Sequence, residues 1–253
     1  MVWRIRLVID DGNPYYQMAL DEALLILRSV NVIPDTLRLY VFNPSSVSIG
    51  YFQSLKRTVN IDQTVKLNIP IVRRITGGGA VYHDVNGEIT YSLVSTLDRI
   101  PHDIAESYRF ITMGVVYAAK YLGVNAEFKP VNDVVVDGRK FSGQAQIRRR
   151  GTVLQHGTFM YATNLDILAS VLRVPQVKLR DKGVSSIRER VTTISEVLGR
   201  RVSRSEAIEA LKYGFSKALD AELYEDKLKP VEVELAKSLE WKYRSREWLE
   251  LRP

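Results

Sequence analysis

The sequence predicts an α+β domain built around a mixed, mostly antiparallel sheet with flanking helices. Short segments rich in β-branched and aromatic residues recur along the chain, and tight-turn signals join several of them. Amphipathic helical segments interrupt them without a regular βαβ alternation. Because no linker, internal repeat or shift in composition divides the 253 residues, we expect a single domain over residues 1–253.

The N-terminal half predicts four or more strands and two long helices. The first segment, MVWRIRLVIDDG, alternates like a strand, and a helix then begins at Asn13 and Pro14, because proline is tolerated at the first helical position. A second helix, DIAESYRFITMGVVYAAKYLG, should end at Gly123. The strand entered through Asn86 and Gly87 follows a strong hairpin signal. The strands expected after the first helix span residues 37–42, 46–52, 69–75 and 88–94, the last being the one entered through Asn86 and Gly87.

The C-terminal half predicts a meander followed by helices. The segment NDVVV turns at Asp137 and Gly138 into RKFSGQAQI, which turns near Gly151 into TVLQHGTFMY. Helical segments follow. They are marked by Asn164 at a start, Gly199 at an end, a capping box from Ser203 to Glu206, and Pro230 at the last start.

Composition limits the classes of function. The chain has 36 basic and 29 acidic side chains, and this net charge of +7 favours acidic partners. It has no cysteine, which excludes disulfides, thiolate–zinc sites and a thioester on the enzyme. His83, His102 and His156 lack metal-ligand spacing, so no permanent metal site is expected. No apolar run is long enough for a membrane span or a signal peptide, and a cytoplasmic location is expected.

The stretch RRITGGGAVYHD, residues 73–84, is the strongest candidate for a binding loop. Three consecutive glycines let backbone amides approach a ligand closely, and such amides form concavities that bind anions. An arginine upstream supplies a permanent charge for carboxylate or phosphate. Because neighbouring side chains of a strand face opposite ways, Arg73 and Arg74 should not both enter one site. A flexible loop without a ligand is the alternative.

The segment RKFSGQAQI predicts one wall of a cleft. In a regular strand, alternation places Lys140, Ser142, Gln144 and Gln146 on one face. A lysine, a hydroxyl and two amides together can bind a polar ligand, but the same face could simply meet solvent.

Three arginines, Arg148, Arg149 and Arg150, form the densest basic cluster and precede Gly151. The first interpretation is a solvated hairpin tip, and the alternative is a docking patch for an acidic partner. Aromatic residues do not interleave with the cluster, so it makes a poor platform for single-stranded nucleic acid.

Several motifs together carry a resemblance to a known family. The segments MALDEALL, SIGYFQS, IVRRITGGGAVYHD, NDVVVDGRKFSGQAQ, LQHGT and DKGVSSIRERV resemble the lipoate–protein ligase family and occur in its order, with a motif core at about residues 33–220. That family shares its fold with biotin ligases and octanoyl transferases. The resemblance therefore implies the biotin/lipoate ligase fold.

The resemblance also implies a reaction and a set of site residues. The reaction would be ATP-dependent activation of lipoate to lipoyl-AMP with Mg²⁺, followed by transfer to a lysine of another protein. Lys140 would be catalytic, and Asp133 would hold magnesium transiently with the nucleotide. The residues implied to bind ATP or lipoyl-AMP are Arg73, Gly77, Gly78, Gly79, Ala80, Val81, His83, Asn132, Asp133, Lys140, Gly143 and His156. For the two histidines, packing is an equal alternative.

The implied partners are proteins that carry a lipoyl domain, namely acyltransferase subunits of 2-oxoacid dehydrogenases and the H protein of glycine cleavage. Nucleic acid and membranes are not expected partners. Many ligases of this family continue into a small accessory domain after a segment that resembles KYRSREWL. That domain is expected to be absent here or to be a separate small polypeptide.

Three rival interpretations remain. An octanoyl or lipoyl transferase with a preactivated acyl donor is the nearest, because MALDEALL and SIGYFQS look equally like those enzymes. Such relatives use a cysteine thioester, and this chain has Asn132 and Asp133 near where they carry the cysteine, which favours the ligase. A biotin ligase is disfavoured, because biotin ligases have extra arginines in their glycine loop where this chain has Gly-Gly-Gly-Ala. A non-catalytic basic binding module would leave the Lys140 segment unexplained.

Overall fold

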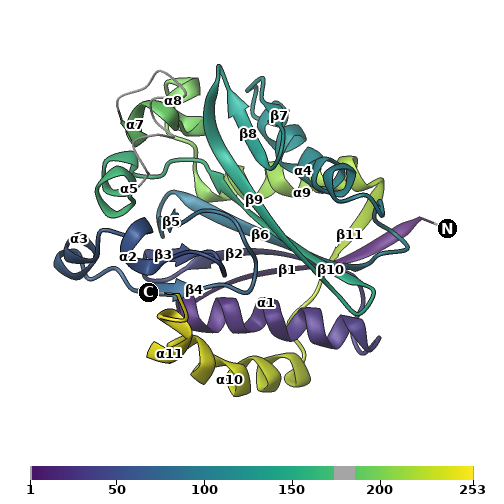
Figure 1. Ribbon diagram of the computed structural model, residues 1–253. Coiled ribbons are helices and arrows are strands. Elements are labelled where there is room, and N and C mark those ends of the chain that lie inside the picture. The colour runs from purple at the N-terminus through teal and green to yellow at the C-terminus, as the bar shows by residue number, and fades with distance from the viewer. Residues whose placement is uncertain (1, 174–185, 253) are drawn as a thin grey trace.

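The structure, a computed structural model, describes residues 2–173 and 186–252 as one large sheet with helices on both faces and a small sheet at its side (Figure 1). The strands are Trp3–Gly12 (β1), Thr36–Phe42 (β2), Ser46–Ile49 (β3), Ile71–Arg73 (β4), Val81–His83 (β5), Glu88–Thr96 (β6), Glu127–Lys129 (β7), Asp133–Val136 (β8), Arg139–Arg149 (β9), Thr152–Met160 (β10) and Ala221–Glu225 (β11). The large sheet has the order β11-β1-β2-β6-β10-β9-β8-β7, and the small sheet has the order β4-β3-β5.

The sheet is mixed and mostly antiparallel, as the sequence predicts. Only β11 and β2, both paired with β1, run parallel to their neighbour in the large sheet. The other pairs in that sheet are antiparallel. In the small sheet β3 pairs parallel with β4 and antiparallel with β5.

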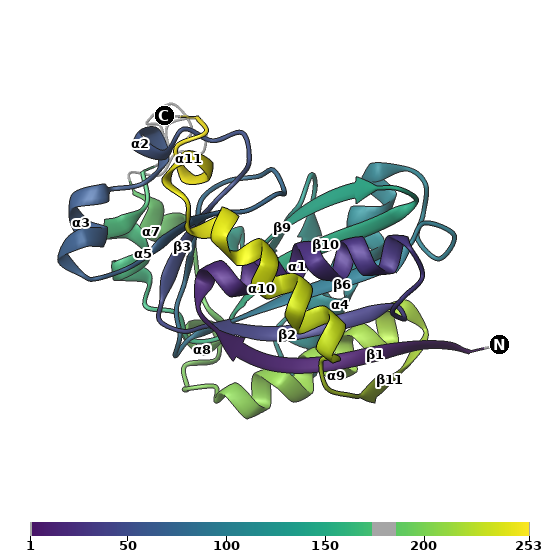
Figure 2. The ribbon, with the colours of Figure 1, turned by 90° about the horizontal axis from the view of Figure 1, so that it is seen from below.

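The long helices form layers on the two faces of the large sheet. The helices are Pro14–Ser29 (α1), Leu55–Thr58 (α2), Ile61–Lys66 (α3), Ile104–Tyr121 (α4), Leu165–Val171 (α5), Ile187–Arg190 (α7), Ile194–Leu198 (α8), Arg204–Leu219 (α9), Pro230–Arg244 (α10) and Arg246–Leu249 (α11). Helix α10 covers α1 on one face, as the view from below shows (Figure 2). On the other face α4 packs against α9. Accordingly, Tyr91 of β6 contacts Phe215 of α9, whereas its neighbour Ser92 bonds to Asp21 of α1.

The helix boundaries follow the capping signals in the sequence. The side chain of Asn13 accepts hydrogen bonds from two amides at the start of α1, and Ser203 forms a capping box with Glu206 at the start of α9. Gly123 and Gly199 have positive φ angles at helix ends, where glycine has no steric penalty. Asn164 caps α5 in the same way as Asn13 caps α1.

The small sheet differs from the sequence prediction. The strands expected at residues 46–52 and 69–75 are only Ser46–Ile49 and Ile71–Arg73, because the chain bends away at Gly50 and at Arg74. Strand β5, within the segment expected to be a loop, closes this sheet by pairing with β3. The first residues of the motif DKGVSSIRERV, 181–185, lie outside the described residues.

A bulge in β9 corrects the predicted faces of that strand. Val134 pairs with Ser142, but the next residue, Val135, pairs with Lys140, so Phe141 is an extra residue in the ladder. An extra residue reverses the alternation, and Lys140 therefore lies over Gly143. A Cβ added there would be only 2.5 Å from Lys140 Nζ. The expected grouping of Lys140 with Ser142 and Gln144 is wrong.

Within the described residues, no helix combines the length and the apolar content that crossing a bilayer requires. The hydrophobic core instead occupies both faces of the large sheet, one part under α1 and α10 and the other under α4 and α9.

The contact between α4 and α9 gives the first prediction. A Cβ added at Gly214 would lie 2.1 Å from the carbonyl oxygen of Gly114, so the helices must separate to accept it. We expect Gly214→Ala to lower the free energy of unfolding by about 1–3 kcal/mol, measured by urea titration. Gly79→Ala is the control, because it meets open space and its φ is not positive. Equal stability of the two variants would contradict this account.

Candidate active site

A pocket opens where the large sheet meets the small sheet. Eight of the residues proposed from the sequence line it, which are Gly79, Ala80, Val81, His83, Asn132, Lys140, Gly143 and His156. The other lining residues are Met18, Tyr40, Phe42, Ser48, Arg74, Thr90, Gln144, Ala145, Gly157 and Thr158. The pocket therefore combines an apolar wall with cationic and hydroxyl groups.

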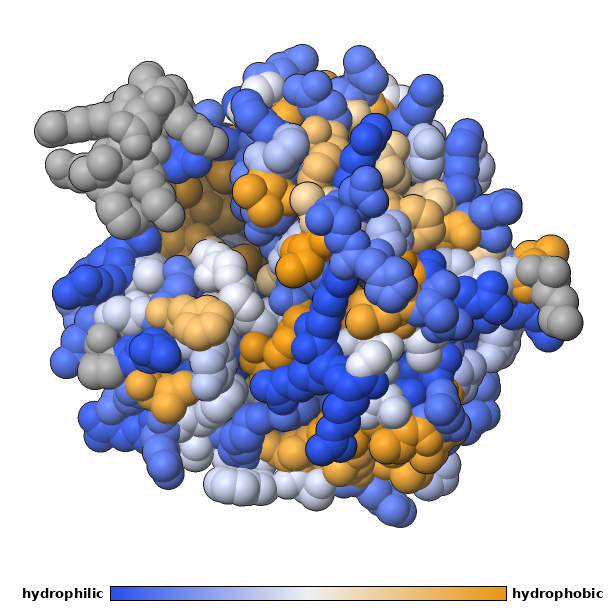
Figure 3. Space-filling model, turned by 45° about the vertical axis from the view of Figure 1, so that its right-hand side comes forward, coloured by the Kyte–Doolittle hydropathy of each residue, from blue (hydrophilic) through white to orange (hydrophobic). Residues whose placement is uncertain are grey.

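An apolar cleft adjoins this pocket. The two share Ala80, Val81, Lys140, Gly143 and Thr158, so Lys140 stands at their junction. The rest of the cleft is mostly aliphatic. It is lined by Met160 of β10, Leu168 of α5, Leu172 just after α5, Ile187 of α7 and Val191 just after α7, with Tyr82 and Arg190 beside them. A hollow with apolar side chains is visible toward the upper left of Figure 3.

Lys140 is held by the bulged end of β9. Its Nζ lies 2.6 Å from Asp133 Oδ1, and the lysine side chain remains 39% exposed. The carbonyl oxygen of Lys140 accepts a hydrogen bond from the amide of Thr192, which ties this strand to the segment after α7. The ammonium is therefore fixed in place but can still reach a molecule in the pocket.

The carboxylate of Asp133 pairs with Lys140. The described residues contain no group of three or more His, Cys, Asp or Glu side chains that could hold a metal by themselves. A Mg²⁺ ion carried by a nucleotide needs only one or two protein carboxylates, so the assignment of Asp133 to such an ion stays a prediction.

Arg73 and Arg74 point in opposite directions, as strand alternation requires. The guanidinium of Arg73 donates to backbone carbonyls of residues 50, 51 and 53 and of the C-terminal residues 248, 249 and 252. It therefore joins α11 to the turn after β3 and does not reach the pocket. The sequence assignment of Arg73 to the ligand is corrected, and Arg74 is the arginine that lines the pocket.

Arg74 holds the glycine loop. Its Nη2 donates to the carbonyl oxygens of Gly77 and Gly79, each at 2.7 Å, and its Nη1 donates to the carbonyl oxygen of Ser48 at 3.3 Å. Gly78 has a φ of +89° and is close enough that a Cβ would lie 3.0 Å from Nη2. Gly77 and Gly78 thus contact the arginine and pack on Gly50. Neither of them lines the pocket.

Burial lowers the pKa of the Arg74 guanidinium to about 10. The described part of the chain contains no salt-bridge partner for it, and all of its acceptors are carbonyl and hydroxyl oxygens. The group is still charged at neutral pH, so it places an uncompensated positive charge beside the pocket.

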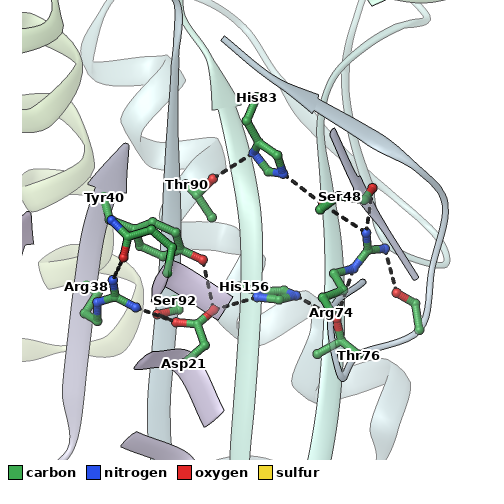
Figure 4. A network of polar contacts seen from close by, with 12 residues as sticks. Asp21, Arg38, Tyr40, Ser48, Arg74, Thr76, His83, Thr90, Ser92 and His156 are labelled. Carbon is green, nitrogen blue, oxygen red and sulfur yellow. Dashed lines mark hydrogen bonds and ion pairs between the residues drawn. The ribbon is translucent and has the colours of Figure 1, made fainter. Parts of the chain in front are cut away.

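Two hydrogen-bonded relays of carboxylate, imidazole and hydroxyl meet at Arg74. Figure 4 shows the first relay and, of the second, the imidazole of His83 and the hydroxyl of Ser48. In the first, Asp21 Oδ2 lies 2.9 Å from His156 Nδ1, and His156 Nε2 lies 2.7 Å from Thr76 Oγ1. Arg74 Nε donates to the same Thr76 hydroxyl at 3.1 Å. The sequence motif MALDEALL thus contributes the carboxylate at the centre of the network.

The second relay runs through the other histidine. Glu88 Oε2 lies 3.1 Å from His83 Nδ1, and His83 Nε2 lies 2.9 Å from Ser48 Oγ. Arg74 Nη1 donates to Ser48 Oγ at 3.2 Å. The His83 ring stacks on Phe42 with centroids 3.9 Å apart, which fixes its orientation. The hydroxyl of Thr90 donates a hydrogen bond to the other carboxylate oxygen, Glu88 Oε1, at 2.8 Å.

The buried Asp21 carboxylate remains ionised. Burial alone would raise its pKa, but the hydrogen bond from His156 and the charge of Arg38 outweigh this effect and lower the pKa. Tyr40 and Ser92 also donate to it, at 2.9 and 2.8 Å. For His156, burial lowers the pKa despite the nearby carboxylate, so the ring is neutral at pH 7.

Asp21, Ser48, Thr76 and Glu88 are site residues that the sequence reasoning missed. Asp21 and Ser48 lie within motifs that carried the resemblance, but no chemical role was assigned to them. Thr76 directly precedes the glycine loop, and Glu88 is the first residue of β6. A signal was available only for Asp21, since an acidic residue inside an otherwise apolar helix must find a partner when buried.

The basic cluster at the β9–β10 turn is only partly free. Arg148 donates to the carbonyl oxygens of residues 101, 102 and 103 and to Ser107 Oγ. Arg149 borders a cleft beside Glu22 of α1. Arg150 and Gly151 both have positive φ angles and form the turn itself. A docking role is therefore open to Arg149 and Arg150 only.

Comparison with protein families adds the evidence of relationship. A family model described as the lipoyl protein ligase A/B catalytic domain matches residues 13–216. The chain is 34% identical to an octanoyltransferase LipM of Brevibacillus brevis, with 97% of this chain and 98% of that protein covered. It is 35% identical to an octanoyltransferase LipM of Bacillus subtilis, with 97% of each covered.

Solved structures resemble the chain over its whole length. One belongs to a bipartite lipoate protein ligase from Thermoplasma acidophilum, studied with its E2 lipoyl domain, at 37% identity and a TM-score of 0.82, covering 98% of this chain and 96% of that one. Another is a lipoate-protein ligase A bound with ATP, at 34% identity and a TM-score of 0.84, covering 98% of both.

These relatives correct the expected reaction. The sequence favoured an ATP-dependent lipoate ligase because the chain has no cysteine, but the curated relatives that match along almost the whole chain are octanoyltransferases. The missing cysteine therefore does not identify a ligase, and the expectation of an ATP-dependent lipoate ligase is wrong.

The pKa of His156 gives a prediction for stability. Because its pKa in the folded protein lies below the value of about 6.5 in the unfolded chain, the unfolded state binds the proton first as pH falls. The stability that the neutral ring contributes is present above pH 6.5 and is lost below it. We expect the unfolding free energy to decrease from pH 7.5 to 5.5 by up to about 1.4 kcal/mol per pH unit.

His156→Gln should flatten this slope, measured by urea unfolding at a series of pH values. His102→Gln is the matched control, because His102 is exposed, and it should leave the slope unchanged. Parallel curves for the wild type and His156→Gln would contradict the assignment.

Proposed function

This chain belongs to the family of the lipoyl protein ligase A/B catalytic domain, and we propose that it is an acyltransferase. It would move an octanoyl group from an already activated donor, such as a thioester, to a lysine of a lipoyl domain. The observation that carries the proposal is the pocket at the sheet junction, where an apolar wall leads to the ammonium of Lys140. Whole-length similarity to octanoyltransferases supports the same substrate.

The lining of the pocket suits a medium-length acyl chain. Met18, Tyr40 and Phe42 supply an apolar wall, and burying methylene groups there is favourable by about 0.8 kcal/mol each. The acyl carbonyl would lie toward Lys140, where the pocket joins the aliphatic cleft. The donor's remaining part can occupy that cleft, since both spaces share the Lys140 side chain.

Acyl transfer from an activated donor needs stabilisation of one developing charge. As a nucleophile attacks the carbonyl carbon, negative charge builds on the carbonyl oxygen, and Lys140 Nζ can donate to it. Asp133 keeps the ammonium in place through their 2.6 Å contact. No phosphoryl group is transferred, so neither ATP nor magnesium enters the scheme.

The net charge of the chain and one structural relative both support a lipoyl domain as the acceptor. The chain carries a net charge of +7, which favours an acidic partner surface. The structural relative from Thermoplasma acidophilum was studied together with a lipoyl domain. A lipoyl domain with its lysine on an exposed turn can present the amine to the exposed side of Lys140.

The direct test uses purified chain, a synthetic octanoyl thioester and a recombinant lipoyl domain, without ATP. Mass spectrometry of the acceptor should detect one added octanoyl group on its lysine. Acylation that occurs only with free octanoate and ATP would contradict the proposal.

Lys140 should be essential to this transfer. We expect Lys140→Ala to lower kcat by about 100-fold or more, because the donor to the developing oxyanion is lost. Arg139→Ala is the matched control on the neighbouring residue, since its only ion pair with a described residue is a 3.8 Å contact with Glu196. Initial rates of acceptor acylation provide the measurement. Near-normal turnover of Lys140→Ala would remove the lysine from the mechanism.

The two free arginines of the β9–β10 turn should contribute to acceptor binding. We expect the double variant Arg149→Ser and Arg150→Asn to weaken the apparent affinity for the lipoyl domain and to flatten its salt dependence. Asparagine is chosen at position 150 because it tolerates the positive φ there.

A second double variant tests whether the position of the arginines or only the net charge of the protein determines acceptor affinity. Lys227→Ser with Lys237→Ser removes the same number of charges from exposed positions elsewhere. It should leave the apparent affinity close to the wild-type value. If both double variants weaken binding equally, net charge alone explains the effect and the turn is not a docking surface.

A further inference from the structure

We propose that Ser48 is the nucleophile of the transfer and carries the acyl group as an ester, with His83 as its base and Glu88 orienting the histidine. This inference rests on the proposed acyltransferase function and gives it a covalent step. The chain has no cysteine, so an enzyme-bound acyl group must use another side chain.

The hydrogen bonds run in the direction that such a role requires. Arg74 donates to Ser48 Oγ, which leaves the serine proton free to point at His83 Nε2, 2.9 Å away. On the other side of the ring, the Glu88 carboxylate lies 3.1 Å from Nδ1 and can only accept when ionised. We therefore assign the proton to Nδ1, and Nε2 is the free base that faces the serine.

Access to the pocket distinguishes this relay from the other one. Ser48 and His83 both line the pocket, as does Thr90 beside Glu88. In the relay of Asp21, the histidine lines the pocket, but the hydroxyl of Thr76 does not. Thr76 instead sits at the base of the glycine loop, and both residues are buried, Ser48 with 2% and Thr76 with 1% exposed. Of the two, only Ser48 lines the space that the substrate would occupy.

The charge beside Ser48 favours attack. Arg74 is fully buried, and the described residues provide it with no ion pair. Its Nη1 lies 3.2 Å from Ser48 Oγ, so it stabilises negative charge on that oxygen as the proton leaves. In a buried setting this interaction is stronger than it would be in water.

The proposed steps balance in atoms and protons. Ser48 Oγ attacks the carbonyl carbon of the thioester while His83 Nε2 takes the serine proton. The tetrahedral intermediate collapses, the carbon–sulfur bond breaks, and His83 returns the proton to the departing thiolate. The neutral amine of the acceptor lysine then attacks the ester. Its proton passes through His83 to Ser48 Oγ as the ester bond breaks, and an amide and free serine remain.

The experiment looks for the ester directly. Wild-type protein mixed with the octanoyl thioester of N-acetylcysteamine, in the absence of acceptor, should gain the mass of one octanoyl group on the peptide that contains Ser48. Addition of lipoyl domain should discharge it. Ser48→Ala should lose the adduct and slow transfer by 100-fold or more. Ser48→Cys should instead form a thioester, which neutral hydroxylamine removes.

Ser46 provides the matched control. It lies on the same strand and its side chain is buried. Its Oγ has no hydrogen-bond partner in the part of the chain that the structure describes, and Ser46 does not line the pocket. Ser46→Ala should acylate and transfer like the wild type. His83→Gln should retain the native unfolding curve but accumulate the ester at least tenfold more slowly.

Two failures can be told apart. If the wild type transfers octanoyl but forms no ester, and Ser48→Ala transfers at the wild-type rate with a native unfolding curve, Ser48 is not the nucleophile and the acyltransferase function stands. If the wild type transfers nothing from the thioester with the lipoyl domain present, the proposed function fails, and the inference falls with it.

Discussion

The site depends on one buried guanidinium, that of Arg74. Its hydrogen bonds join the hydroxyl of Ser48 in β3 to the hydroxyl of Thr76 and the carbonyls of the glycine loop that follows Thr76. A cation buried without an acidic partner is costly, and burial accordingly lowers its pKa. The carbonyl dipoles of the loop offset part of that cost. The loop is therefore ordered by the arginine, and the arginine keeps a positive field at the pocket.

The sequence predicts much of this fold because its signals are local. Side-chain caps and positive-φ glycines depend on a few consecutive residues, so the starts of α1 and α9 and both ends of α4 agree with the prediction. The bulge in β9 is different, since it appears only when that strand pairs with β8. A single extra residue, Phe141, reversed the expected face of Lys140. The shortness of β3 and β4 likewise reflects contacts made by Arg73 and Arg74 in three dimensions.

The candidate site was predicted only in part, because sequence signals again reveal only what is close along the chain. The residues of the glycine loop and of β9 are close in sequence, so the motifs locate the pocket. The relay partners are not close. Ser48 meets His83 because β3 pairs with β5, and His83 meets Glu88 across the turn into β6. Asp21 reaches His156 only because α1 packs under β10. Such pairs follow from sheet order, which no spacing rule for a single sequence contains.

The missing cysteine was given too much weight, and the structure explains why. Lack of a thiol excludes a thioester on the enzyme, but it says nothing about the donor, which can arrive already activated. A serine hydroxyl is a weaker nucleophile than a cysteine thiolate, so forming the ester requires a base, an orienting carboxylate and a nearby positive charge. All three surround Ser48 through His83, Glu88 and Arg74. The same fold can therefore support acyl transfer with a hydroxyl in place of a thiol, provided that the buried arginine stays charged.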